Sequence, residues 1–193
     1  SPDGELLAAL GRRGQPGDAP DQFDRPTDVA FEPSGDFFVS DGYGNACVHK
    51  YSPDGKLLKT WGEPGTDPGQ FSTPHDVCCD TDGWVYVADR ENHRVQVFDG
   101  NGRFETQWHD LHRPRGMYMP PGKCPICYVG EIGPYYEFNR GAPNLGPRVS
   151  ILSNDGKLLA RITSTPAHGT GPGQFISPHG MAVDSRGDLY VAE

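Results

Sequence analysis

A repeated sequence pattern constrains the fold of this chain more strongly than any other feature. Each copy contains a proline, a short apolar run, a turn and a second apolar run that ends in an acidic residue. The four prolines, Pro26, Pro74, Pro114 and Pro178, are separated by 48, 40 and 64 residues. Repeats of this length predict an array of similar units, each of which buries its apolar faces against its neighbours.

Each complete repeat contains four short strand signals. In the first, we expect strands at about 28–32, 36–41, 46–51 and 56–61. Pro33-Ser34-Gly35 and Pro53-Asp54-Gly55 supply the residues that tight turns between strands require. Four strands in each 40–50 residues are typical of a β-propeller blade. The alternative is a Greek-key sandwich, which the regular self-similarity disfavours.

The composition supports an all-β class. The chain has 26 glycines and 19 prolines among 193 residues, which exceeds average usage and indicates either disorder or many tight turns. Disorder is disfavoured because 9 Phe, 8 Tyr and 3 Trp lie in regularly spaced apolar runs. We therefore expect a β-propeller made of four-stranded blades.

The repeats also predict how the chain is divided. We expect the outer strand of one blade at 1–12, blades at 26–62, 74–108 and 114–163, and a half blade at 178–193. The third blade carries a Gly/Pro/Asn-rich loop insertion with three aromatic residues. These pieces do not close a ring, so the sequence predicts a partial, open fragment of a propeller, with six blades in the full protein. Its exposed edges are expected to favour association.

Charge and hydropathy exclude some partners and leave the compartment unassigned. A net charge of −9 argues against nucleic acid, and no apolar run approaches the roughly 20 residues of a membrane-spanning helix. The five cysteines lack disulfide-framework spacing, so they assign no compartment. Cys124 and Cys127 have C-x-x-C spacing, but they begin an expected strand rather than a helix. This favours a chance pair over a redox or metal site.

Strand order places several polar residues at one rim of the propeller. The positions just before the first strand of each blade are Thr27, His75, Arg115 and His179. Histidine recurs in every second repeat, and alternate blades of a six-bladed ring lie about 120° apart. Three such histidines would form a zinc site with one open position. The third would lie about twenty residues upstream of Ser1, by the spacing of the repeat.

The spacing alone leaves a second interpretation open, in which the two histidines are turn residues bonded to the backbone. The other histidines have no convergent partners in the sequence pattern, and we expect them at the surface. They are His49, His93, His109, His112 and His168.

Four segments carry a resemblance to a known family. They are Pro26-Thr-Asp-Val29, Val39-Ser-Asp-Gly-Tyr43, Gly69-Gln-Phe-Ser-Thr-Pro-His75 and Val87-Ala-Asp-Arg-Glu-Asn92. They resemble the lyase domain of peptidylglycine amidating enzyme, peptidyl-α-hydroxyglycine α-amidating lyase, a six-bladed propeller of NHL-type repeats. The similarity is strong over 5–108 and returns at 173–193.

The resemblance implies a zinc-dependent carbon–nitrogen lyase in the full-length protein. It implies that His75 and His179 are two of three zinc ligands, that Tyr43 takes a proton from the substrate hydroxyl, and that Arg90 is an active-site cation. The substrate class is a small molecule or a peptide C-terminus at the channel face. Because one ligand lies upstream, the chain alone is expected to be inactive.

Some positions depart from the family pattern. Gly44 and Tyr86 stand where two family cysteines would be, and the first zinc-binding His and a second Arg lie upstream of the chain. Gly180 stands where the family has an aspartate that helps to bind calcium, which puts a calcium site in doubt. The alternative function is a non-catalytic NHL-repeat scaffold that binds a protein or small ligand on its channel face.

Overall fold

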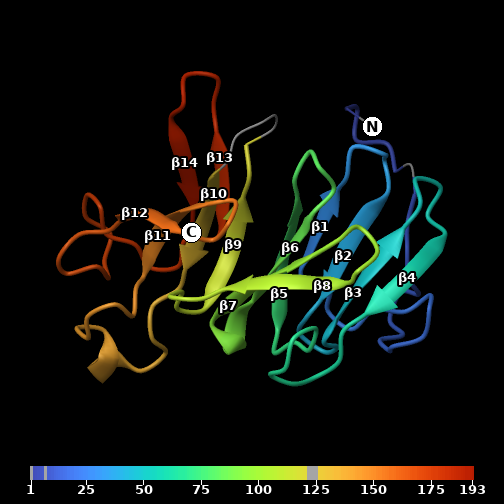
Figure 1. Ribbon diagram of the computed structural model, residues 1–193, viewed down its shortest axis with the longest axis horizontal. Helices are drawn as coiled ribbons and strands as arrows, with labels where there is room; N and C mark the ends of the chain where they lie inside the picture. The colour runs from blue at the N-terminus through green and yellow to red at the C-terminus, as the bar shows by residue number, and fades with distance from the viewer. Residues whose placement is uncertain (1, 7, 121–125) are drawn as a thin grey trace.

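The computed structural model describes residues 2–6, 8–120 and 126–193. In this part of the chain the regular structure is β, apart from two 3₁₀ turns, η1 (Arg90–Asn92) and η2 (Glu137–Asn139). The strands form antiparallel sheets that fan out side by side (Figure 1). The all-β expectation is therefore confirmed. No helix in the described part has the length and apolar character needed to cross a membrane.

Three sheets are complete four-stranded blades and a fourth has two strands. The first contains β1 (Asp28–Phe31), β2 (Phe37–Asp41), β3 (Cys47–Tyr51) and β4 (Leu57–Trp61). The second contains β5 (Pro74–Cys79), β6 (Val85–Asp89), β7 (Arg94–Phe98) and β8 (Phe104–Trp108). The third contains β9 (Pro114–Tyr118), β10 (Ile126–Glu131), β11 (Arg148–Ser153) and β12 (Leu158–Ile162), and the last β13 (Gly180–Val183) and β14 (Leu189–Ala192). Strands follow chain order across each sheet.

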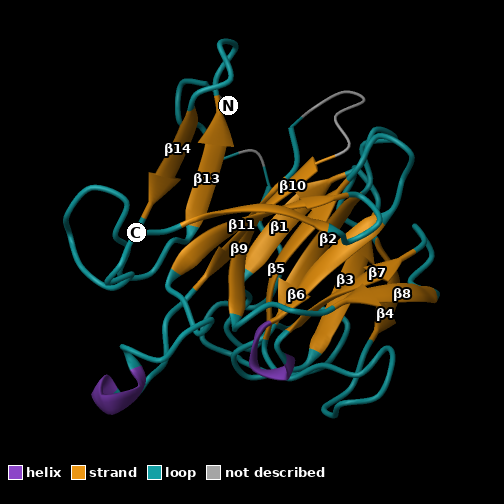
Figure 2. Ribbon diagram, turned by 60° about the vertical axis from the view of Figure 1, so that its left-hand side comes forward, coloured by secondary structure: helices purple, strands orange, loops and turns teal. Residues whose placement is uncertain are grey.

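The first strand of each blade lies innermost. β5 contacts both β1 and β9, and β9 also contacts β13, so these four strands lie side by side along the centre (Figures 1 and 2). The sheets do not close on themselves, as the sequence predicts for a partial propeller.

Apolar layers between adjacent blades hold the array together. The layer between the first and second blades contains Phe38, Trp61, Phe71, Val87 and Phe98. The layer between the second and third contains Tyr86, Val95, Trp108, Met117, Cys127 and Leu152. Each fully buried side chain of this size stabilises the fold by about 1.5–3 kcal/mol through removal from water. A single blade has no such layer, which is why the blades must stack.

The expected outer strand at 1–12 is not formed in the described residues 2–6 and 8–12. A strand is defined by hydrogen bonds to a neighbour, and no described strand pairs with this segment. Elsewhere the strands of the first blade begin or end within one residue of their expected positions.

The direction in which the strands run determines which connections lie at each end of the blades. In Figure 1 the turns that join β1 to β2, β5 to β6 and β13 to β14 lie at the top. The connections that lead into β5 and β13 arrive from the opposite end. His75 is the second residue of β5 and His179 directly precedes β13, so both lie where these strands begin.

Candidate functional site

A β-bulge positions the first candidate ligand, His75. In the β5–β6 ladder Pro74 pairs with Asp89 and Asp76 pairs with Ala88, so His75 is the extra residue between them. Bulges redirect side chains relative to a regular strand. The His75 side chain is buried, with 2% of its surface exposed.

His75 and His179 meet, although 104 residues of sequence separate them. Their ring centroids are 5.1 Å apart, with the rings inclined at 65°. His179 comes directly before β13, and β9 lies between β5 and β13. Gly116 in β9 allows this approach, because a Cβ at that position would overlap the carbonyl oxygen of His179.

The hydrogen bonds of His75 define the role of each ring nitrogen. Nδ1 donates to the carbonyl oxygen of Arg115 at 2.9 Å, which leaves Nε2 as an acceptor. The Tyr43 hydroxyl, in the loop after β2, lies 2.9 Å from Nε2 and donates to it. Tyr43 is exposed on its other side, so it faces both the histidine and solvent.

Arg90, the first residue of η1, also contacts this cluster directly after β6 ends. Its Nη1 donates to the Tyr43 hydroxyl oxygen at 3.1 Å, and its guanidinium carbon lies 5.3 Å from the centroid of the Tyr43 ring. Glu91 Oε1 accepts hydrogen bonds from Arg90 Nε at 2.7 Å and from Arg113 Nη2 at 2.8 Å. The guanidinium of Arg90 is therefore held in one orientation by a carboxylate behind it.

Both histidines are held in the neutral form. Burial lowers the pKa of His75 to about 4, although its hydrogen bond to the Arg115 carbonyl acts in the opposite direction. Burial, followed by the positive charge of Arg115, lowers the pKa of His179. Neutral imidazoles are the form that binds metal ions.

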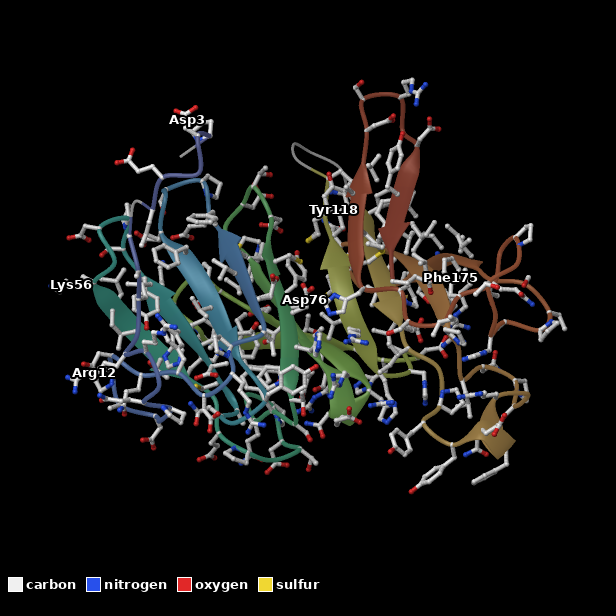
Figure 3. All side chains as sticks on the ribbon, turned by 180° about the vertical axis from the view of Figure 1, so that it is seen from behind. Asp3, Arg12, Lys56, Asp76, Tyr118 and Phe175 are labelled. Carbon is white, nitrogen blue, oxygen red and sulfur yellow. The ribbon has the colours of Figure 1, made fainter. Side chains whose placement is uncertain are left out.

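Two carboxyl groups lie next to the histidines on the innermost strands. Figure 3 marks Asp76 near the middle of the molecule, where these strands run side by side. Burial raises the pKa of Asp28 and raises that of Asp76 well above its ordinary value, and the charge of Asp28 adds to the second shift. Asp76 Oδ1 is buried and has no hydrogen-bond partner among the described residues.

Arg115 is a further candidate that the sequence placed at the rim without a role. It lies in β9, its Nη1 donates to Ser177 Oγ at 2.6 Å, and its positive charge acts on both histidines. Its Nε is buried and has no hydrogen-bond partner within the described ranges. The recurrence of the position before the first strand of each blade was the signal for it in the sequence.

Two expectations about the remaining histidines are wrong. His93 and His112, which were expected to have no partners, meet with ring centroids 4.9 Å apart, and His112 is half-buried. His49 is buried, with 2% of its surface exposed, because its ring packs edge-on against Phe23 with centroids 5.4 Å apart. The Cys124 part of the C-x-x-C motif lies outside the described residues, whereas Cys127 is buried in β10.

The insertion of the third blade forms an exposed aromatic loop. Tyr135, Tyr136 and Phe138 are at least 61% exposed, and the rings of Tyr136 and Phe138 stack with centroids 5.6 Å apart. A cavity of about 520 Å³ lies between residues 140–148 and 161–167. The histidine cluster, made of Tyr43, His75, Arg90 and His179, contributes no residue to the lining of this cavity.

Comparisons with known proteins agree with this architecture. The NHL repeat family model matches residues 23–51 and 71–98. The chain is 36% identical to peptidyl-glycine alpha-amidating monooxygenase A of Xenopus laevis, over 97% of this chain and 20% of that protein. It is 34% identical to peptidyl-alpha-hydroxyglycine alpha-amidating lyase 1 of Drosophila melanogaster, over 99% of this chain and 37% of that protein.

A solved structure shows the same fold at much lower sequence identity. Virginiamycin B lyase from Staphylococcus aureus superposes with a TM-score of 0.60 at 16% identity, over 87% of this chain and 48% of that one. The chain thus spans about a fifth to two fifths of the two curated relatives above. The chain thus carries NHL repeats in a partial β-propeller and is similar, over nearly its whole length, to proteins named as peptidyl-α-hydroxyglycine α-amidating lyases.

Proposed function

We propose that the full-length protein is a zinc-dependent lyase that cleaves the carbon–nitrogen bond of a C-terminal α-hydroxyglycine, giving a peptide amide and glyoxylate. The observation that carries this proposal is the convergence of His75, His179 and Tyr43 from three different blades. The names of the relatives support the reaction class.

The donor set of the cluster is suited to zinc. Burial favours the neutral form of His75 and His179, and the Arg115 carbonyl fixes the His75 tautomer so that the lone pair is on Nε2. This lone pair accepts the Tyr43 hydroxyl hydrogen bond and would bind the metal in its place. A backbone carbonyl in this position is the usual partner of a zinc-bound histidine. The third ligand of the proposed site is a histidine from a preceding repeat. Zinc supplies Lewis acidity, which lowers the pKa of a hydroxyl that it binds.

Tyr43 is the proposed base of the reaction. Arg90 donates a hydrogen bond to its oxygen, which stabilises negative charge there and keeps the oxygen next to His75. In the phenolate form, with His75 Nε2 given over to the metal, Tyr43 would accept the proton of the substrate hydroxyl. The carbon–nitrogen bond would break as the carbonyl of glyoxylate forms, and Tyr43 would return the proton to the departing amide nitrogen. No oxidant or reductant is needed.

Two arginines are suited to the substrate carboxylate. Arg90 faces the exposed side of Tyr43, and Arg115 has a buried Nε without a partner among the described residues. Guanidinium groups bind carboxylates through paired N–H donors. We assign the α-carboxylate of the hydroxyglycine to this pair, with a peptide C-terminus as the substrate class.

Metal content and product release test the proposal in the full-length protein. We expect His75→Ala and His179→Ala each to lose one equivalent of zinc relative to the wild type, as measured by mass spectrometry, and to lose glyoxylate release from an α-hydroxyglycyl peptide. His109→Ala, at an exposed histidine, is the matched control and should change neither. Unchanged zinc content in both variants, or a wild type without zinc, would instead support a non-catalytic scaffold that binds a protein or small ligand.

A further inference from the structure

A buried acidic residue ends the second strand of each complete blade, and in two blades an arginine neutralises it. Asp89 pairs in register with Arg94, the first residue of β7, and Arg94 Nε lies 2.8 Å from Asp89 Oδ2. Glu131 pairs in the same way with Arg148, at 2.8 Å. The residue two positions beyond the arginine, Gln96 or Ser150, also donates a hydrogen bond to the carboxylate.

The first blade keeps this frame but lacks the arginine. Asp41 pairs in the equivalent register with Cys47, and His49 takes the position of Gln96 and Ser150. Asp41 accepts hydrogen bonds from the Asp24 backbone N–H at 3.0 Å and from Asn45 at 2.7 Å. Asp89 has the same two kinds of partner, the Ser72 backbone N–H and Asn92. The fully buried Asp41 carboxylate therefore has the same uncharged hydrogen-bond donors as Asp89, but no arginine side chain beside it in the described part of the chain.

Asp41, Cys47 and His49 are three possible metal ligands, grouped where the other blades have a guanidinium beside the carboxylate. Cys47 Sγ lies 3.4 Å from His49 Nε2, and His49 Nε2 lies 3.7 Å from Asp41 Oδ2. The three ligand atoms all lie within 4.8 Å of one another. Bond lengths of about 2.0–2.3 Å in a tetrahedral zinc site place ligand atoms roughly 3.3–3.6 Å apart. The Cys47–His49 and His49–Asp41 separations are therefore close to those of a metal-bound set.

The surroundings of His49 orient it as a ligand. Thr60 Oγ1 lies 2.8 Å from His49 Nδ1 and accepts a hydrogen bond from the Nδ1–H group, so the lone pair on Nε2 faces Cys47 and Asp41. A metal-bound histidine typically donates its other ring N–H to a neighbouring oxygen in this way. Phe23 packs edge-on against the ring, while Cys47 is only partly buried and leaves that side of the cluster open to solvent.

We propose that Asp41, Cys47 and His49 form a second metal site, specific for a borderline divalent ion such as Zn²⁺, with water as the fourth ligand. A set of thiolate, imidazole and one carboxylate selects zinc over magnesium or calcium, which prefer all-oxygen ligands. The bound ion supplies the positive charge that Arg94 and Arg148 supply in the other blades, and it links β2 to β3. The site lies within one blade and shares no residue with the histidine cluster of the channel.

Cobalt(II) is the probe that separates the two sites. Thiolate ligation gives a sulfur-to-cobalt charge-transfer band in the near ultraviolet, and the His75 and His179 site contains no sulfur. We expect the band when cobalt is added to the wild-type protein, and we expect Cys47→Ser to abolish it. His75→Ala and Cys79→Ser should both keep it, the second as the same substitution at another partly buried cysteine.

A second variant guards against loss of folding. Cys47→Arg combined with His49→Gln installs the set Asp, Arg and Gln that the next blade already contains. This variant should keep the wild-type circular dichroism spectrum and cooperative unfolding. It should bind cobalt at this site more than about 100-fold more weakly, which exceeds the loss expected when only a residue that orients a ligand is removed. Absence of the band in the wild type, or its persistence in the double variant, would overturn the proposal.

Discussion

The carbonyl oxygen of Arg115 accepts a hydrogen bond from His75 Nδ1 at 2.9 Å, and this contact links the second blade to the third. It has two consequences for the ring of His75. The tautomer is fixed with Nε2 as the acceptor, and the ring is oriented toward Tyr43 and His179. A backbone group, rather than a side chain that can change rotamer, therefore sets the geometry of the candidate site.

The first prediction concerns the Tyr43 hydroxyl. In the full-length protein, we expect Tyr43→Phe to lower kcat for glyoxylate release by about 10²–10⁴-fold, the usual contribution of a positioned proton acceptor. KM should change much less, because both arginines stay in place. Zinc content should be unchanged, since His75 and His179 are intact. Steady-state kinetics with an α-hydroxyglycyl peptide is the measurement.

Tyr136→Phe is the matched control for that substitution. Tyr136 is 61% exposed on the insertion loop and takes no part in the histidine cluster, so the kcat of the Tyr136→Phe variant should equal that of the wild type. If Tyr43→Phe also retained wild-type kcat, the base would have to be another group.

The second prediction follows from the ionisation of Glu91. Burial alone would raise its pKa, but hydrogen bonds from Arg113 and Arg90 outweigh burial and hold the pKa below the ordinary value of 4.5. A carboxyl whose pKa is lower in the folded state stabilises the fold above the unfolded pKa, and this stabilisation is lost as the pH falls through the folded pKa. We expect Glu91→Gln to lower the free energy of unfolding by up to about 1 kcal/mol at neutral pH.

The same difference should shrink as the pH falls below 4.5 and through the lower folded-state pKa. Urea unfolding of the wild type and of Glu91→Gln over a series of pH values from neutral into acid measures it. A difference of equal size at all of these pH values would show that the carboxylate charge is not what stabilises Arg90 and Arg113.

The third prediction compares a buried and an exposed ion pair. Glu131 and Arg148 form a buried pair, with 0% and 5% of their side chains exposed. Arg148→Ala leaves the Glu131 carboxylate buried without a cation, which costs about 3–5 kcal/mol. Arg186→Ala removes an arginine of which 72% is exposed, and should cost less than about 1 kcal/mol. Urea denaturation of both variants tests this, and equal losses would contradict it.

The sequence predicted the blades well because their signals are local and repeated. The Gly35 and Gly55 turns and the alternating apolar runs each act over a few residues, and the strands of the first blade lie within one residue of their expected bounds. The outer strand expected at 1–12 stays a prediction. Its sequence resembles that of 52–62, but a strand also requires a neighbour to pair with, and none of the described strands pairs with this segment.

The site was predicted only in part. Repeat position placed His75 and His179 at one rim, and the structure brings their rings to within 5.1 Å. The bulge at His75 depends on the pairing of β5 with β6, and the burial of His49 depends on the distant Phe23. Neither is encoded in spacing along the chain. The replacement of Arg94 and Arg148 by Cys47 in the first blade is visible in the sequence, but its meaning requires the register of the strands.

The last prediction concerns Gly116, which touches neither Tyr43 nor a ring nitrogen of either histidine. A Cβ at this position would overlap the carbonyl oxygen of His179, so Gly116→Ala should push β13 away from β9 and separate the rings of His179 and His75. We expect zinc affinity of the histidine cluster in the full-length protein to fall by about 10–100-fold, as for other changes that misplace a ligand. Gly141→Ala is the control, because a Cβ there meets nothing within 4 Å. Competition with a chelating dye measures both affinities. Wild-type zinc affinity in Gly116→Ala would mean that close packing of β9 against His179 does not position the ligand.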